Sequence, residues 1–140
     1  MTAAAVLAPV FVQIALTFGL LLWMGAARIR ALREKRLHIR DMALGEPNWP
    51  ASVTQIQNAH QNQFELPVLF YVLVILALAT SHATATLVIL SWVFVVSRLA
   101  HAFIHTTSNN VPRRFWVYCV GLAAMMLMWA AFAVNIVTGW

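Results

Sequence analysis

The sequence predicts an all-α integral membrane protein built as a bundle of four transmembrane helices. The chain of 140 residues is 62% hydrophobic and only 9% charged, with a mean hydropathy of +0.79. A water-soluble domain is typically about 45–50% apolar and about 25% charged, so this composition excludes a soluble globular enzyme. The charged residues leave three uncharged stretches, at 1–27, 66–97 and 115–140. The length fits a single domain over residues 1–140.

The uncharged stretches set the number of membrane crossings. A helix needs roughly 20 apolar residues to cross a hydrocarbon core about 30 Å thick. The first and last stretches fit one helix each, whereas the middle stretch of 32 residues would be roughly 48 Å long as one helix. We therefore expect the middle stretch to form a helical hairpin with a tight turn near 80–83. The expected helices lie at about 4–32, 52–79, 84–105 and 112–137.

Turn and capping residues support these boundaries. The segment 33–50 contains a glycine and two prolines, so we interpret it as a polar loop. Ser52 or Thr54 can then cap the helix that follows, because both side chains accept hydrogen bonds from free N–H groups at a helix start. Pro112 opens the last helix, since proline is favoured in a first turn.

The distribution of positive charge predicts the orientation. Six of the nine basic residues lie at 28–40, at the end of the first helix and in the loop after it, and two more lie at the start of the last helix. The N-terminus, the 80–83 turn and the C-terminus carry no Lys or Arg. The positive-inside rule therefore places both basic loops in the cytoplasm and both termini on the other side, in a membrane that we expect to be a bacterial inner membrane. Basic residues there suit anionic lipid headgroups, and no aromatic–basic pattern indicates nucleic acid.

Ionisable residues inside the predicted helices mark a candidate functional site. A charge within a membrane helix is costly and is by default a sign of function. Counted from the 80–83 turn, Glu65 lies roughly 22 Å down the second helix and Arg98 roughly 21 Å down the third. This matched depth predicts that the two charges contact each other, within one subunit or across a subunit boundary. The alternative is that the pair only holds two helices together.

Helical spacing gathers further polar side chains near the same depth. Two polar faces, one on the second helix and one on the third, are expected to meet below a basic pair at the start of the last helix. They would form a positively charged cavity open to the cytosol and suited to an anionic small molecule. The two histidines share their face with no carboxylate or cysteine, so no metal site is expected. The members are Asn58, Asn62, Glu65, Arg98, His101, His105, Arg113 and Arg114.

Three stretches of the chain resemble a known family. The sequence NAHQNQFELP at 58–67 is similar to the second-helix signature of the MAPEG family, the membrane-associated proteins in eicosanoid and glutathione metabolism. The sequence RLAHAFIH at 98–105 resembles the third-helix signature, and PRR at 112–114 resembles the entry to the fourth helix. The order, the spacing and the four-helix pattern agree over essentially the whole chain, which is identified as a bacterial-type member.

This resemblance implies an assembly and an activity. The four-helix subunit would form a homotrimer in contact with membrane lipids, and glutathione would bind as co-substrate between neighbouring subunits near the cytosolic side. The protein would then be a glutathione-dependent transferase or peroxidase that acts on lipophilic electrophiles or hydroperoxides delivered from the bilayer.

The resemblance also implies roles for individual residues. Arg114 would stabilise the glutathione thiolate as the catalytic residue, and Arg28 or Arg30 would pair with a glutathione carboxylate. Arg113 competes with Arg114, but neighbours on a helix diverge by about 100°, so only one should face the cavity. The other residues expected to hold glutathione or support its site are Asn62, Glu65, Arg98, His101 and His105.

Whether the protein is an enzyme stays open at this stage. Asn58 stands where the family signature has an arginine, which removes one partner for a glutathione carboxylate. The alternative is a non-catalytic lipid-binding protein, or a scaffold or accessory subunit of a larger membrane complex. A transporter using Glu65, Arg98 and His101 as a relay is disfavoured, because the outer half of the helices is uniformly apolar.

Overall fold

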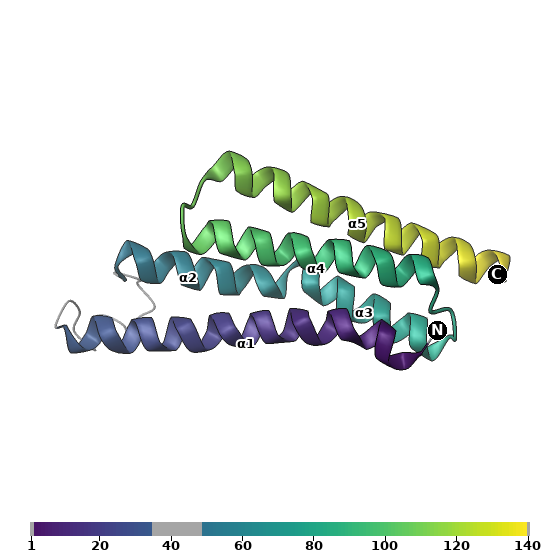
Figure 1. Cartoon of the computed structure of the whole chain (residues 1–140), viewed down its shortest axis with the longest axis horizontal. Helices are drawn as coiled ribbons and strands as arrows, with labels where there is room; N and C mark the ends of the chain where they lie inside the picture. The colour runs from purple at the N-terminus through teal and green to yellow at the C-terminus, as the bar shows by residue number, and fades with distance from the viewer. Residues whose placement is uncertain (1, 35–48, 140) are drawn as a thin grey trace.

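A computed structural model describes residues 2–34 and 49–139 of the chain. No strand occurs within these two ranges. Most of the polar loop expected at 33–50, with its glycine and prolines, lies outside the described residues. The helices are α1 (Ala3–Arg33), α2 (Ala51–Gln61), the short 3₁₀ helix η2 (Asn62–Phe64), α3 (Leu66–Ala79), α4 (Ala85–Thr106) and α5 (Val111–Thr138), as Figure 1 shows.

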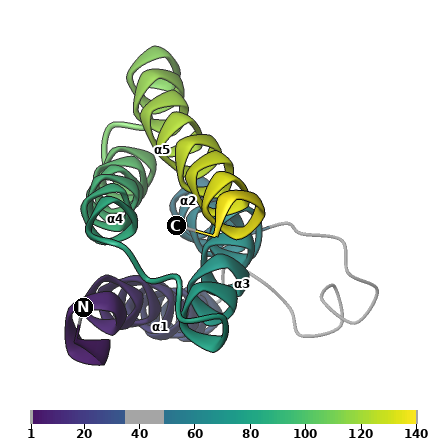
Figure 2. The same ribbon diagram turned by 90° about the vertical axis from the view of Figure 1, so that its right-hand side faces the viewer.

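The helical segments account for the membrane crossings. In the part of the chain that the structure describes, four lengths of helix are long and apolar enough to span a membrane: α1, Ala51–Ala79, α4 and α5. This finding confirms the all-α transmembrane fold class expected from the composition. The helices run side by side, and Figure 2 shows α1 and α5 on opposite sides of the bundle with α4 and the α2–α3 span between them.

An apolar core fills the half of the bundle nearest the chain termini. Phe70, Leu73, Phe94 and Met128 are fully buried where α3, α4 and α5 meet. The polar groups lie at the opposite end of the bundle. There α2 and α5 begin, and α1 and α4 end. The fold therefore places the polar half of the second span at the end that carries the basic residues.

The second span is interrupted, which differs from the continuous helix expected at 52–79. The chain tightens into η2 after Gln61, and Glu65 leaves helical geometry with φ −97° and ψ −107°. Pro67 lies in the first turn of α3 and has no N–H, so it could not donate to the carbonyl of Gln63 in a continuous helix. The resulting offset between α2 and α3 is visible in Figure 1 and brings irregular backbone to membrane depth.

Candidate functional site

A polar cleft lies beside the break in the second span. Its volume is about 630 Å³, and α2, the break, the end of α4 and the start of α5 line it. Its lining is almost entirely polar, which is unusual in a chain of this hydropathy. Its principal side chains are Asn58, Asn62, Glu65, His105, Asn109 and Arg114.

Asn62 stands at the centre of this arrangement. Its side-chain Nδ2 lies 3.4 Å from Nδ1 of His105, so the two expected polar faces do meet through this hydrogen bond. Asn62 also lines a smaller cavity of about 250 Å³ together with His101, Arg114 and Tyr118. Asn62 and Arg114 thus lie between the large cleft and the small cavity and are accessible from both.

Arg114 enters the cleft from the first turn of α5. Its Nη1 donates a hydrogen bond of 2.7 Å to Oδ1 of Asn109. Asn109 has a positive φ of 47°, a conformation that asparagine tolerates better than most residues, and it lies in the loop before α5. The side chain of Asn110 caps α5 by accepting from the N–H of Arg113 at 3.0 Å. The arginine therefore sits where a helix start adds positive electrostatic potential to its own charge.

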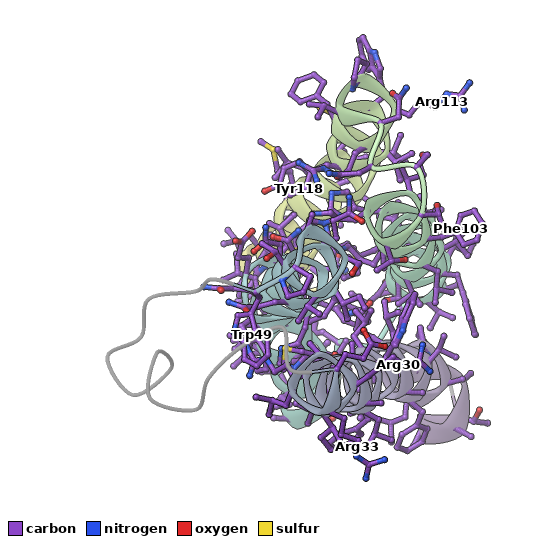
Figure 3. All side chains as sticks on the ribbon, turned by 90° about the vertical axis from the view of Figure 1, so that its left-hand side faces the viewer. Arg30, Arg33, Trp49, Phe103, Arg113 and Tyr118 are labelled. Carbon is purple, nitrogen blue, oxygen red and sulfur yellow. The ribbon has the colours of Figure 1, made fainter. Side chains whose placement is uncertain are left out.

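Arg113 points elsewhere, as helical geometry requires of the neighbour of Arg114. Its side chain is exposed, whereas Arg114 is half-buried and lines both cavities. Figure 3, viewed from this end of the bundle, shows Arg113 projecting away from the helices. Of the two arginines, Arg114 is the one that the structure brings to the cleft.

The buried guanidinium of Arg98 lies next to the break. Its side chain is only 1% exposed, and Nη2 donates a hydrogen bond of 3.4 Å to the main-chain oxygen of Asn62. The guanidinium carbon also lies 5.7 Å from the ring centroid of Tyr118, a distance typical of a cation–π contact. Its Nε and Nη1 have no hydrogen-bond partner among the described residues.

The expected ion pair between Glu65 and Arg98 is not formed within the subunit as the structure describes it. Glu65 is exposed and lines the cleft, although its charge still attracts that of Arg98. The reason is the break: the 3₁₀ turn takes about 3.0 residues per turn instead of about 3.6, so Glu65 follows α2 at another angle than a continuous helix would give it. The carboxylate is thereby available to a ligand or to a neighbouring subunit.

Two histidines complete the inner side of the site. His101 and His105 are each 4% exposed, and their rings meet edge to face with centroids 5.8 Å apart. His101 also contacts the ring of Tyr118, and its Nδ1 has no hydrogen-bond partner in the described ranges. Within residues 2–34 and 49–139, no three His, Cys, Asp or Glu side chains are grouped as metal ligands. The two rings therefore add ring nitrogens, which donate or accept hydrogen bonds according to the tautomer, beside the positive charges of Arg98 and Arg114.

The arginines of α1 do not line the cleft of their own subunit. Nη2 of Arg28 donates a hydrogen bond of 2.8 Å to Oε1 of Gln57, and its guanidinium stacks over Trp49 with 5.1 Å to the ring centroid. Arg30 instead lines a separate cavity of about 270 Å³ between α1 and α2. Arg28 ties α1 to α2, and either arginine would reach a cleft only if a neighbouring subunit brought one to it.

Several residues of the site were not expected from the sequence. Asn109 and Tyr118 carry no periodic signal, because each is a single polar side chain whose position depends on a turn or on a neighbouring helix. Gln13 and Gln63 are fully buried and hydrogen-bonded to each other. Gln13 could have been noticed, since it is the only amide side chain in the uncharged stretch 1–27.

Comparison with known proteins identifies the family. The family model of the MAPEG family matches residues 6–134, which is nearly the whole chain. No curated protein and no solved structure matches the chain. The matched region covers α1 and α5 except for their outermost residues, the other two spans in full and every residue of the cleft. The apolar helices make the chain an integral membrane protein, and the match shows that it belongs to the MAPEG family.

Proposed function

We propose that this protein is a membrane-embedded glutathione-dependent transferase or peroxidase that acts on lipophilic electrophiles. MAPEG proteins generally use glutathione, and their activities at family level are glutathione-related transfer and peroxide reduction. The observation that carries the proposal is the half-buried Arg114 at the start of α5, which lines a polar cleft beside Asn62 and Glu65.

The side chains of the cleft fit the chemistry of glutathione. Glutathione carries two carboxylates, an ammonium group and a thiol, and it would supply the sulfur nucleophile. Arg114 and the start of α5 favour a thiolate over a thiol, since a nearby positive charge stabilises the anion. The carboxylate of Glu65 suits the ammonium group, and Asn62 offers an amide to the peptide backbone. Arg98, His101 and His105 support this arrangement from the buried side.

An assembly of several subunits would complete the site. Asn58, Gln61 and Glu65 form an exposed polar face inside the second span, and polar groups facing lipid are unfavourable. We propose a homotrimer, the typical assembly of MAPEG proteins, in which this face packs near the axis. Arg28 or Arg30 of a neighbouring subunit would then reach a glutathione carboxylate.

The proposed site faces the cytosol. The cleft lies at the end of the bundle that carries Arg113 and Arg114 and, on α1, Arg28, Arg30 and Arg33. By the positive-inside rule this end is cytoplasmic, so both termini are on the opposite side of a membrane that we propose is a bacterial inner membrane. Glutathione would enter from the cytosol and the electrophile from the bilayer.

One observation favours a second function, that of a non-catalytic lipid-binding or scaffold protein. Asn58 lines the cleft at the position where the family signature has an arginine, so the cleft has one cation fewer for a carboxylate. A protein that has lost glutathione chemistry would retain the fold, the apolar surface and the membrane location.

Calorimetric titration distinguishes the two functions. Glutathione is titrated into the protein in lipid nanodiscs, with Glu65→Gln and Asn62→Ala as cleft variants and Arg113→Ala as the matched surface control. The enzyme proposal predicts saturable binding that both cleft variants weaken and the control does not, together with conjugation of a lipophilic chloroarene. Absence of binding and of conjugation would leave the lipid-binding function.

A further inference from the structure

A buried pair of glutamines connects α1 to the break in the second span. Gln13 is 0% exposed and Gln63 is 2% exposed, although both lie in helices that face lipid elsewhere. Nε2 of Gln13 donates a hydrogen bond of 2.8 Å to Oε1 of Gln63, across 50 residues of sequence. Burying an amide costs desolvation free energy, which an apolar side chain at the same position would not cost.

The second glutamine passes the connection on to the backbone of α2. Nε2 of Gln63 donates a hydrogen bond of 2.8 Å to the main-chain oxygen of Ala59. Ala59 is in the last turn of α2, where the final carbonyl groups of a helix lack partners within the helix. Ala59 is fully buried, so no water reaches its carbonyl oxygen, and the side chain of Gln63 takes the place of water.

The other side of the break is held from α4. The guanidinium of Arg98 donates to the main-chain oxygen of Asn62, the first residue of η2. The turn is thus fixed between two helices: Gln13 of α1 acts through Gln63, and Arg98 of α4 acts directly. These contacts fix where the chain leaves α2 and therefore how the next residues are turned.

The residues so fixed are those of the cleft. Asn62 begins η2 and Glu65 directly follows it, and both line the cleft beside Arg114. We propose that Gln13, which does not itself line the cleft, is a positioning residue: through Gln63 it sets the orientation of Asn62 and Glu65 and hence the affinity of the site. This inference rests on the proposed function for its ligand, glutathione.

The hydrogen bond itself, and not only the packing, carries this role. Oε1 of Gln13 has no hydrogen-bond partner among the described residues, so burying this amide is costly for stability. A methionine at position 13 has nearly the same length and shape without the donor. It should be tolerated in the membrane, and it should release Gln63 and the turn that follows.

The first test compares binding with stability in the full chain in nanodiscs. Gln13→Met and Gln63→Met each remove the same hydrogen bond, and Ser91→Ala is the control. Ser91 of α4 is buried, and its hydroxyl donates a hydrogen bond of 2.7 Å to the main-chain oxygen of Leu87. This hydrogen bond lies away from the break. We expect Gln13→Met to raise the Kd for glutathione about tenfold, the effect of one lost hydrogen bond. Gln63→Met also loses the hydrogen bond to Ala59, so the double variant should bind no worse than Gln63→Met alone. Equal Kd values for Gln13→Met and Ser91→Ala would overturn the proposal.

A second readout does not depend on glutathione. Cys119 is the single cysteine of the chain, so Cys119→Ala gives a background for labelling. Glu65→Cys and Asn58→Cys place a thiol at two positions that line the cleft, one after and one before the start of the break. We expect Gln13→Met to change the rate of maleimide labelling at position 65 at least about threefold and to leave position 58 unchanged.

The two readouts separate the two proposals. If the unmodified protein binds no glutathione, the proposed function fails, and the labelling rates alone decide whether Gln13 positions the turn. If the unmodified protein binds glutathione, an unchanged Kd in Gln13→Met refutes the effect on affinity. Unchanged labelling at position 65 refutes the positioning of the turn whatever the function of the cleft.

Discussion

The guanidinium of Arg98 donates its hydrogen bond to the main-chain oxygen of Asn62 and not to the carboxylate of Glu65. An intramembrane arginine is commonly expected to pair with the nearest carboxylate, because either charge alone is costly. Here the broken backbone of the second span supplies the acceptor. The arginine thereby stabilises an irregular turn, and the carboxylate lines the cleft with no ion pair to Arg98 among the residues that the structure describes.

This relationship predicts weak energetic coupling between Arg98 and Glu65. Arg98→Gln should lower the free energy of unfolding by about 1–3 kcal/mol, because the Asn62 carbonyl loses its buried donor. Glu65→Gln, on an exposed position, should change it by less than about 0.5 kcal/mol. In a double-mutant cycle measured by reversible detergent unfolding, the two effects should add to within about 0.5 kcal/mol. Coupling well above that value would reveal a direct ion pair, within a subunit or between subunits.

Close packing of α4 against α5 at Gly121 leads to a second prediction. A Cβ added at Gly121 would lie 2.5 Å from Oγ of Ser97, which donates a hydrogen bond of 2.6 Å to the main-chain oxygen of Phe94. Gly121→Ala should therefore destabilise the fold by about 1–3 kcal/mol, the usual cost of overpacking. The measurement is the midpoint of thermal or detergent unfolding.

Two controls isolate this contact. Gly25 of α1 would meet nothing within 4 Å, so Gly25→Ala should be neutral or stabilising by up to about 1 kcal/mol. In a Ser97→Ala background the hydroxyl is gone, and Gly121→Ala should cost much less than it does alone. An equal cost in both backgrounds would show that the Ser97 hydroxyl is not the obstacle.

The exposed polar face of the second span predicts self-association. Asn58, Gln61 and Glu65 are exposed in the single subunit, and lipid cannot satisfy their hydrogen-bonding groups. Native mass spectrometry of protein released from nanodiscs should show an oligomer, a trimer on the present account. The combined change of Asn58 and Gln61 to leucine should shift the population toward smaller species, and a stable monomer of the unmodified protein would refute the assembly.

The sequence predicted the spanning helices well because their signal is long and depends on composition. The charge-free stretches at 1–27, 66–97 and 115–140 are each longer than the roughly 20 apolar residues that a helix needs to span a membrane. The divergence of Arg113 and Arg114 also follows from helical periodicity alone. Such features depend on near neighbours in the sequence, and no knowledge of tertiary contacts is needed to derive them.

The break and its contacts could not be predicted in the same way. Counting depth along an ideal helix placed Glu65 opposite Arg98, but the 3₁₀ turn before Pro67 rotates the carboxylate out of that position. Gln13 lies 50 residues from Gln63, and nothing in either local sequence names the other as its partner. A buried amide indicates that a partner exists, whereas its identity depends on how the helices pack.

The central claim, that Arg114 and not Arg113 stabilises a bound thiolate, is tested most directly by the near-ultraviolet absorbance of the thiolate when glutathione is added to the purified protein in nanodiscs. Arg114 lines the cleft and Arg113 is exposed, although both carry the same charge in the same turn of α5. We predict a thiolate signal that Arg114→Ala abolishes and that Arg113→Ala largely retains. Equal loss in the two variants, or no thiolate signal in the unmodified protein at saturating glutathione, would contradict the account.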